Sequence, residues 1–273
     1  MNVGPSLGRV LIVAGSDSGG GAGIQADIKT VTMLGAYAMT AVTAITVQNT
    51  QGVTAVHEVP LDIVQGQIEA VAGDIGIDVV KTGMLASRPM IEAVADTLAR
   101  SAIGVPRVVD PVMRAKGGHA LLAEDAADAL VRRLVRGAAV VTPNLPEAEV
   151  LTGRRLRTVA DMDAAVEACR ALGAEAVLLK GGHLEGAHLV DLLITRDEVV
   201  RFHDLRIDTS STHGTGCTLA SAIAAGLARK MSLRDAVTGA RAYVRKAILT
   251  APGLGRGHGP LNHGHLLPGS NRD

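Results

Sequence analysis

Short runs rich in β-branched residues alternate with longer amphipathic stretches along the whole of this 273-residue chain. The runs predict strands, and several are apolar at every position, as in strands that are covered on both faces. Alternation of such strands with helices predicts a parallel sheet with helices on both sides. The predicted strands are 10–15, 37–48, 53–59, 79–83, 107–113, 138–144, 176–182, 188–195 and 198–204, and the predicted helices are 23–35, 61–74, 88–102, 123–135, 146–152, 160–172, 214–229 and 233–250.

A single domain over 1–273 accounts for this pattern, because the sequence contains no repeat, no low-complexity linker and no shift in composition. About 1–8 and 256–273 are expected to be loosely ordered, since the tail from Gly253 onward is rich in Gly, His and Pro. Aromatic residues make up 1% of the chain, so the core has to be packed from Val, Leu, Ile and Ala. This deficit argues against the aromatic platforms that bind single-stranded nucleic acid.

The charges balance, with 27 Lys and Arg residues against 27 Asp and Glu residues. There is no basic surplus that would predict binding to nucleic acid or to an anionic membrane. Cys169 and Cys217 make a poor disulfide framework for a chain of this size and are expected to be reduced thiols. The chain opens without a charged and then apolar leader, and no apolar stretch approaches the ~20 residues that span a bilayer. These features predict a soluble cytoplasmic protein.

The segment GSDSGGGAG, residues 15–23, joins the first predicted strand to the first predicted helix. It does not fit the dinucleotide pattern G-x-G-x-x-G, because Ile24 stands where glycine is required, and no lysine follows as in a P-loop. Asp17 occupies the position that the nucleophilic serine takes in G-x-S-x-G. The loop is interpreted either as a backbone that a ligand can approach closely or as an ordinary glycine turn.

The segment THGTGCT, residues 212–218, places a cysteine at the start of the most helix-prone run of the chain. Gly214 and Gly216 permit a sharp turn, after which the backbone N–H groups of 214–217 point out of the helix start. Such a terminus binds anions through its dipole and its donors, and it also favours the thiolate of a cysteine placed there. A phosphoryl group in transfer would fit this turn, with Cys217 facing the acceptor. The alternative is a buried structural cysteine.

Carboxylates and a lysine end further predicted strands. Asp110 closes one strand, and Glu147 follows Asn144 by three residues at the start of a predicted helix. Both carboxylates suit Mg²⁺ held through water, while Asn144 and Glu147 also fit a capping box, and the two interpretations are compatible. Lys180 ends an apolar strand beside two glycines, which suits a phosphate, although a surface lysine is the alternative. Because the carboxyl ends of parallel strands share one edge of a sheet, these groups are expected to converge.

Gln48 closes the second predicted strand. Its side-chain amide can donate and accept hydrogen bonds at once, so it could pair with the amino group and the ring nitrogen of an aminopyrimidine. Taken alone, the residue is equally explained as a polar strand end. The histidines show no metal-ligand spacing, and no zinc site is predicted.

The motifs stand in the order AGSDSGGGAGIQADIKT, GAYAMTAVTAITVQNTQGV, KTGML, VVDPVM, TPNLPEAEVLTG, LLKGGH and HGTGCTLASAIAAGLA, over nearly the whole chain. In this order they resemble the ribokinase-like superfamily and, within it, the hydroxymethylpyrimidine/phosphomethylpyrimidine kinases of thiamine biosynthesis. The resemblance implies a three-layer α/β/α sandwich with a mostly parallel central sheet. It also implies that ATP, with Mg²⁺, phosphorylates 4-amino-5-hydroxymethyl-2-methylpyrimidine and then its monophosphate at one site.

The resemblance also implies roles for single residues. It places pyrimidine contacts at Gly15, Asp27, Thr46, Gln48, Met84 and Val112, and Mg²⁺ at Asp110 and Glu147. It implies nucleotide contacts at Thr142, Asn144, Lys180 and Thr215, and catalytic roles for Lys180, Cys217 and the turn formed by Gly214, Thr215 and Gly216. Cys217 stands where many members of the superfamily carry a catalytic aspartate, a replacement found in the pyrimidine-kinase branch. The loop 114–122 is interpreted as a flap that closes over the pyrimidine.

The expected partner is a small-molecule substrate, and a homodimer is expected because relatives are often dimers. The nearest alternative is a pyridoxal kinase of vitamin B6 salvage on the same scaffold, since Gln48 and Met84 favour a pyrimidine without excluding a pyridine. A sugar kinase, a cysteine-dependent hydrolase or redox protein, and a catalytically inactive pyrimidine binder are weaker alternatives. The first loop of this chain has fewer polar residues than a polyol site would need, which disfavours a sugar kinase. The absence of C-x-x-C disfavours a redox protein, and an inactive binder does not explain why Asp110, Glu147 and Lys180 are present.

Overall fold

The computed structural model describes residues 7–114, 118, 121–123 and 126–268. Within them the chain forms a sheet with the strand order β3-β2-β1-β4-β5-β6-β7-β8-β9. Neighbours from β2 through β1 to β7 are parallel, whereas β3, β8 and β9 are antiparallel additions at the two ends. The strands are β1 Arg9–Ser16, β2 Tyr37–Asn49, β3 Gly52–Glu58, β4 Val79–Thr82, β5 Arg107–Val109, β6 Val140–Val141, β7 Ala176–Lys180, β8 His188–Thr195 and β9 Val199–Leu205.

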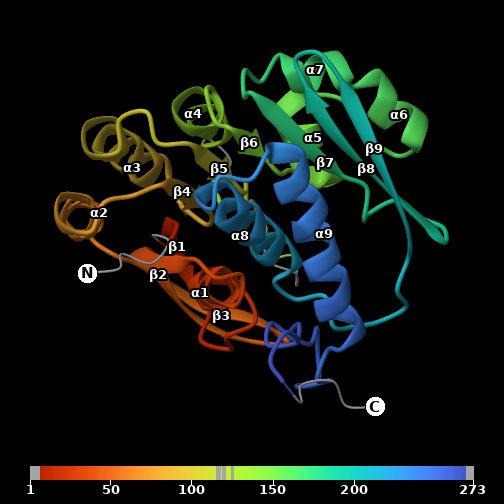
Figure 1. The fold of residues 1–273 in the computed structure, drawn as a ribbon, viewed down its shortest axis with the longest axis horizontal. Coiled ribbons are helices and arrows are strands. Elements are labelled where there is room, and N and C mark those ends of the chain that lie inside the picture. Colours follow the sequence, from red (N-terminus) through yellow and green to blue (C-terminus); the bar gives the residue numbers. More distant parts are fainter. Residues whose placement is uncertain (1–6, 115–117, 119–120, 124–125, 269–273) are drawn as a thin grey trace, which may run out of the picture.

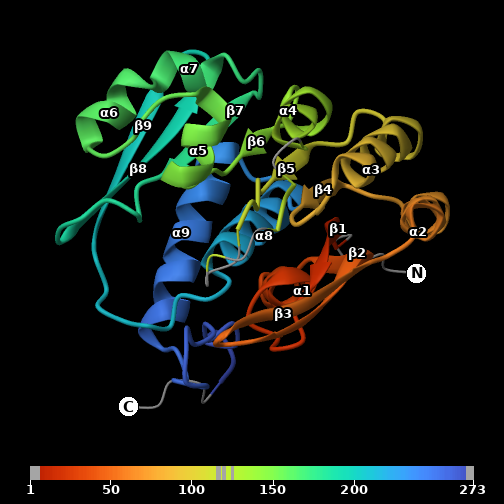
Figure 2. The same cartoon turned by 180° about the vertical axis from the view of Figure 1, so that it is seen from behind.

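Helices cover both faces of the sheet and complete a three-layer α/β/α sandwich, as predicted. One face carries α1, α8 and α9, and the other carries α2, α3, α4 and the helices that follow up to α7. Figure 1 shows the two helical layers on opposite sides of the strands, and Figure 2 shows the same arrangement from behind. The helices are α1 Gly23–Met33, α2 Leu61–Asp74, α3 Arg88–Ser101, α4 Ala127–Leu130, α5 Leu145–Thr152, α6 Val159–Ala164, α7 Val166–Arg170, α8 Thr215–Ala228 and α9 Leu233–Leu249.

Strand β1 shows why the runs are apolar at every position. Val10, Ile12 and Ala14 pack in the cluster formed with α1, α8 and α9, while Leu11 and Val13 pack in the cluster formed with α2 and α3. Each large side chain buried in this way contributes about 1.5–3 kcal/mol relative to an exposed one. Because the middle of β1 has no face toward solvent, its polar residues come only at its ends, and the carboxyl end leads into the loop 15–23.

Strands β5 and β6 are shorter than the predicted runs 107–113 and 138–144. Each ends just ahead of a proline, Pro111 or Pro143, in the sequences VVDPV and VTPN. Proline has no N–H to donate to a neighbouring strand, so ladder pairing stops there. Asp110 and Thr142, just before these prolines, each make one last backbone hydrogen bond, to Thr82 O and Val109 O at 3.0 Å, where the ladder ends.

Two predicted helices are interrupted. The predicted helix 160–172 divides at Ala165 into α6 and α7. In place of the predicted helix 123–135, the structure has the short α4, Ala127–Leu130, which continues into the π-helical turn Val131–Val135. No helix in the described part of the chain combines the length and the apolarity that crossing a membrane requires.

The C-terminal segment 256–268 is packed, contrary to the expectation that it is loosely ordered. Leu261, His263 and His265 are each less than a tenth exposed. The backbone N–H of His213 donates to Gly259 O at 3.1 Å, and the hydroxyl of Tyr243 donates to His263 O at 2.6 Å. Composition suggested a loose tail because Gly, His and Pro are common in loops, but these contacts fix the segment against α8 and α9.

Candidate functional site

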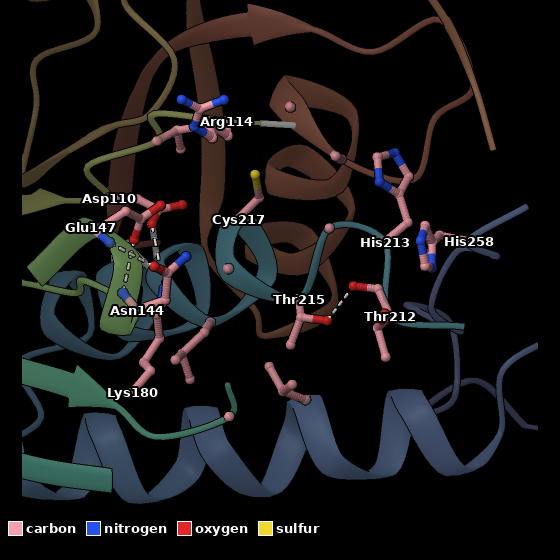
Figure 3. A pocket seen from close by; sticks show the side chains of 18 of the residues that line it. Asp110, Arg114, Asn144, Glu147, Lys180, Thr212, His213, Thr215, Cys217 and His258 are labelled. Atoms are coloured by element: carbon pink, nitrogen blue, oxygen red, sulfur yellow. Dashed lines mark hydrogen bonds and ion pairs between the residues drawn. The ribbon is translucent and has the colours of Figure 1, made fainter. Parts of the chain in front are cut away.

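A cavity of about 770 Å³ lies where the parallel strands end and α8 begins. Ligands of open parallel sheets bind at this edge. Figure 3 shows Cys217 between Asp110 and Glu147 on one side and His213 on the other. Of the residues that the sequence singles out, the structure brings together along this cavity Gly15, Thr46, Gln48, Met84, Asp110, Val112, Asn144, Glu147, Lys180, Gly214, Thr215, Gly216 and Cys217.

Asp27 lies outside the cavity, so the implied pyrimidine contact is corrected. Its carboxylate is fully buried and accepts hydrogen bonds from Lys81 Nζ at 2.8 and 3.0 Å and from Ser221 Oγ at 2.7 Å. Lys81, which the sequence analysis missed as a separate group, does line the cavity. Burial lowers the pKa of Lys81, but the carboxylate of Asp27 outweighs that effect and raises it, so the ammonium stays charged. Asp27 therefore holds a buried cation in the cavity wall.

Thr142 also lies outside the cavity, and its implied nucleotide contact is corrected in the same way. The side chain is fully buried, and its hydroxyl donates to Asp110 Oδ1 at 3.4 Å. The Lys180 ammonium lies 3.7 Å from the same oxygen. Thr142 and Lys180 thus fix the direction of the Asp110 carboxylate, which itself reaches the cavity.

Asn144 and Glu147 form the capping box at the start of α5. The Asn144 side chain accepts from the backbone N–H of Glu147 at 2.9 Å, and the Glu147 carboxylate accepts from the backbone N–H of Asn144 at 2.8 Å. Burial raises the pKa of Glu147 to about 7, with Lys180 opposing the shift and Asp110 adding to it. Since burial disfavours the ionised carboxylate, a cation placed beside Glu147 would stabilise it.

The glycine-rich loop 15–23 is organised by Asp17, which the sequence analysis did not select. Its carboxylate accepts from the backbone N–H groups of Gly19, Gly21 and Ala22 at 2.8 to 3.1 Å, and its Oδ2 lies 2.8 Å from His213 Nε2. Burial raises the pKa of Asp17, but the hydrogen bonds from His213 and the backbone outweigh it and lower the pKa. An aspartate shortly before a glycine run is a signal for such a side-chain-to-backbone turn.

The start of α8 is left open for an anion. Its N-cap is Gly214, with φ of 81° and no side chain to cap the first turn. A Cβ at this position would overlap the carbonyl of Gly21 in the glycine-rich loop, so only glycine fits at this contact between the two loops. The Thr215 hydroxyl donates to Thr212 O at 2.6 Å (Figure 3). The Thr215 backbone N–H donates to the same carbonyl at 3.4 Å. The N–H groups of Gly216 and Cys217 have no partner within the helix and are available to a bound anion.

Cys217 is a neutral thiol in this setting. Burial raises its pKa to about 12, although the nearby Lys81 ammonium opposes the shift. The structure does not favour the thiolate expected from the sequence, because burial and the carboxylates of Asp27 and Asp110 oppose the anion more than Lys81 supports it. Cys169, by contrast, is buried in the core away from the cavity.

The loop 114–122 lies largely outside the described residues. Arg114, Gly118 and Leu121 are described and line the cavity, and Arg114 Nη1 donates to Gly118 O at 3.2 Å. Its interpretation as a flap stays a prediction.

The far end of the cavity is lined by arginines that no sequence motif marks. Arg241 is neutralised by Asp191 and Asp204 at 2.9 and 2.8 Å. Arg206 donates to the carbonyls of Gly182 and Gly186, so its guanidinium holds the chain between β7 and β8. Arg241 on α9 meets its partners on β8 and β9 only in the folded chain.

Known proteins match this chain over almost its full length. A family model described as phosphomethylpyrimidine kinase matches residues 17–262. The hydroxymethylpyrimidine/phosphomethylpyrimidine kinase of Rhizobium meliloti is 51% identical over 258 residues, which cover 93% of this chain and 96% of that one.

Solved structures of ribokinase-like fold match as well. The pyridoxal kinase of Bacillus subtilis in complex with ADP has a TM-score of 0.87 and 38% identity, covering 94% of this chain and 98% of that one. The phosphomethylpyrimidine kinase of Clostridium difficile has a TM-score of 0.78 and 41% identity, covering 88% and 99%.

Proposed function

The chain belongs to the phosphomethylpyrimidine kinase family, and from that premise we propose that it is the ATP-dependent kinase of thiamine biosynthesis that phosphorylates an aminopyrimidine alcohol twice. The first acceptor is the hydroxymethyl group of 4-amino-5-hydroxymethyl-2-methylpyrimidine, and the second is the monophosphate formed from it. The observation that carries the proposal is a single cavity lined both by the uncapped start of α8 and by Gln48.

The pyrimidine is proposed to bind at the end of the cavity formed by β1, β2 and β4. Gln48 offers a donor and an acceptor to the amino group and its neighbouring ring nitrogen. Gly15, Met84 and Val112 line the same cavity, and Met84 Sδ lies within 3.0 Å of where a Cβ on Gly15 would stand. A side chain at position 15 would therefore take up space that a flat ring needs.

The nucleotide phosphates are proposed to bind at the start of α8. The first-turn N–H groups of Gly216 and Cys217 supply donors, and Lys180 supplies a positive charge from the end of β7. The Thr215 hydroxyl and backbone N–H both donate to Thr212 O, at 2.6 and 3.4 Å, so Thr215 holds the turn that presents these donors. The ADP complex of the related pyridoxal kinase supports ATP as the donor.

Asp110 and Glu147 are proposed to hold Mg²⁺. Both offer oxygen ligands to the cavity, and the pKa of Glu147, raised by burial, reflects a carboxylate that a cation would stabilise. Among the described residues, no group of three or more His, Cys, Asp or Glu side chains is arranged to hold a metal. Mg²⁺ is usually held by one or two carboxylates together with substrate phosphates and water, so two carboxylates suffice. When bound, the ion would offset charge on the transferring phosphoryl group.

The transfer forms a bond from the acceptor oxygen to the γ-phosphorus and breaks the bond between that phosphorus and the bridging oxygen of ADP. The hydroxyl proton leaves to solvent. Phosphoryl transfer has a loose transition state, so positioning and charge neutralisation matter more than a strong base. Lys180 and the amides of Gly216 and Cys217 supply that neutralisation. Cys217, being protonated, shapes the pocket beside the acceptor and does not accept the proton.

Pyridoxal is the second candidate substrate. The observation that favours it is the higher TM-score of the pyridoxal kinase structure, 0.87 against 0.78 for the phosphomethylpyrimidine kinase structure. A pyridine ring with a hydroxymethyl group has the size that the proposed pyrimidine site accepts. Gln48 favours the aminopyrimidine, because pyridoxal has no amino group for it to recognise.

A homodimer is proposed through the exposed side of β2 and β3. Ile45 and Val47 are more than half exposed on the side of β2 opposite to Thr46, and β3 is the edge strand of the sheet. Apolar side chains at a sheet edge are normally covered. Size-exclusion chromatography with light scattering should give a dimer for the wild type and a monomer for Val47→Glu, and a wild-type monomer refutes the proposal.

A coupled ATP assay with Mg²⁺ tests the function. The aminopyrimidine alcohol, its monophosphate and pyridoxal are offered separately to the wild type and to Gln48→Leu. The proposal is supported if the wild type phosphorylates both pyrimidines faster than pyridoxal, and if Gln48→Leu lowers the rate with both pyrimidines. Refusal of the monophosphate, or a preference for pyridoxal, refutes it.

A further inference from the structure

The glycine-rich loop clamps Gln48 in place. Ser18 Oγ donates to Gln48 O at 2.8 Å and accepts from Gln48 N at 2.9 Å, which fixes the backbone of this residue. The side-chain amide then lies between two partners at its opposite ends. Thr46 Oγ1 is 3.1 Å from Oε1, and His213 Nε2 is 3.4 Å from Nε2.

Thr46 has only one proton to give. Its hydroxyl lies 2.8 Å from Ser16 O, which can only accept, and this is the shorter of its two contacts. Once the proton is committed to Ser16 O, the Thr46 oxygen offers only lone pairs to Gln48. The end of the amide that faces Thr46 must therefore be a donor.

His213 makes the opposite demand at the other end. Its Nε2 lies 2.8 Å from Asp17 Oδ2, and the Asp17 carboxylate already accepts three backbone N–H groups, which favour its ionised form. A nitrogen facing a carboxylate at this distance carries a proton. That proton is directed at Asp17, so Nε2 has no lone pair left to accept from Gln48. The carbonyl oxygen is therefore favoured at the end of the Gln48 amide that faces His213, because the amino group would set a second donor against this N–H.

We infer that Thr46 and the Asp17–His213 pair set the orientation of the Gln48 amide, with its carbonyl oxygen toward His213 and its amino group toward Thr46. Half a turn of the terminal amide exchanges its two ends with almost no change in shape, so hydrogen-bond partners decide between them. Both neighbours require the same choice, although they come from different segments, β2 and the loop before α8. Thr46 and His213 are therefore positioning residues that determine specificity.

The orientation selects a ring substituent, and this step rests on the proposed function. After its two neighbours are satisfied, the amide retains one acceptor position on the His213 side and one donor position on the Thr46 side. An aminopyrimidine fits when its amino group lies toward His213 and its ring nitrogen lies toward Thr46. A 4-oxo pyrimidine presents the reversed pattern, an oxygen and a ring N–H. It would pair with Gln48 only if the amide turned over. The amino group would then face the N–H of His213, and the carbonyl oxygen would face the lone pairs of Thr46.

The test compares binding of 4-amino- and 4-oxo-5-hydroxymethyl-2-methylpyrimidine by calorimetry without ATP. The wild type should bind the amino compound about 10- to 100-fold more tightly, because the oxo compound leaves buried groups unpaired or opposed. Thr46→Val and His213→Phe should each bring this ratio about tenfold closer to one, and Thr46→Ser should restore it. Thr43→Val is the matched control, because Thr43 lies buried on the same strand and donates to Met84 O at 2.7 Å without touching Gln48.

A ratio cancels general losses of stability or activity, so a merely structural role for these residues would leave it unchanged. An altered ratio in Thr46→Val or His213→Phe, with Thr43→Val unchanged, supports the inference. Equal binding of the two compounds by the wild type, or a ratio that neither variant alters, overturns it. Failure of the wild type to phosphorylate the amino compound refutes the proposed function instead, since the binding ratio is measured without turnover.

Discussion

His263 is expected to make the stability of the protein depend on pH below neutrality. Its Nε2 lies 3.0 Å from Thr218 Oγ1 in the first turns of α8, and the side chain is 4% exposed. Burial, with smaller contributions from Lys29 and His265, lowers its pKa from 6.5 to about 4. Between these values the unfolded chain binds a proton that the folded chain does not. The stabilisation is complete above pH 6.5 and is lost as the pH falls, by about 2 kcal/mol near pH 5 and about 3 kcal/mol below pH 4.

Urea unfolding of the wild type and of His263→Gln measures this effect. At about pH 7.5 the variant should be less stable, because it loses the packing and the bond to Thr218, and by about pH 5 this difference should shrink by roughly 2 kcal/mol. His188→Gln, which alters an exposed histidine, serves as the control and should parallel the wild type. A constant difference between wild type and His263→Gln across this range would refute the reasoning, because it would mean that the folded His263 titrates normally.

Three further variants test the site. Cys217→Ala should keep kcat within about tenfold of the wild type, because a protonated thiol supplies no base, and a folded variant without turnover would contradict this. Lys81→Met should lower the free energy of unfolding by about 3–5 kcal/mol in denaturant titrations, because it leaves Asp27 buried and unpaired, and adding Asp27→Leu should recover much of the loss. Gly214→Ala should reduce kcat about 10²- to 10³-fold by displacing the α8 amides, whereas Gly239→Ala, with open space around it, should leave kcat unchanged; equal rates for the two would refute the anion-hole assignment.

The sequence was sufficient for the layers of the fold because its strands are buried on both faces. A run such as 10–15 contains no polar residue, so its length and its β-branched residues identify it as a buried strand. The same patterns could not locate the ends of β5 and β6, where Pro111 and Pro143 stop the ladder before the apolar run ends. Nor could composition reveal the packing of 256–268, which depends on contacts with α8 and α9.

The convergence of the site was predictable because strand ends share an edge, whereas the role of each residue in it was less so. Asp27 and Thr142 belong to matching motifs, yet the fold turns both away from the cavity, toward Lys81 and Asp110. Asp17 and His213 lie almost 200 residues apart, |i−j| = 196, so no local pattern joins them. A motif therefore identified the segments that build the cavity, but distances were needed to separate the residues that line it from those that support them.

A neutral thiol at position 217 follows from the charges around it. The cavity wall already holds the buried pair of Asp27 and Lys81, and Asp110 stands nearby with Lys180. Both Asp27 and Asp110 raise the pKa of Cys217, so an anion at this position would be opposed by two carboxylates. A carboxylate there would also compete with Asp27 for Lys81 and with an incoming phosphate for the α8 amides. The thiol adds no charge, so it leaves Lys180 and the start of α8 to neutralise the phosphoryl group in two successive transfers.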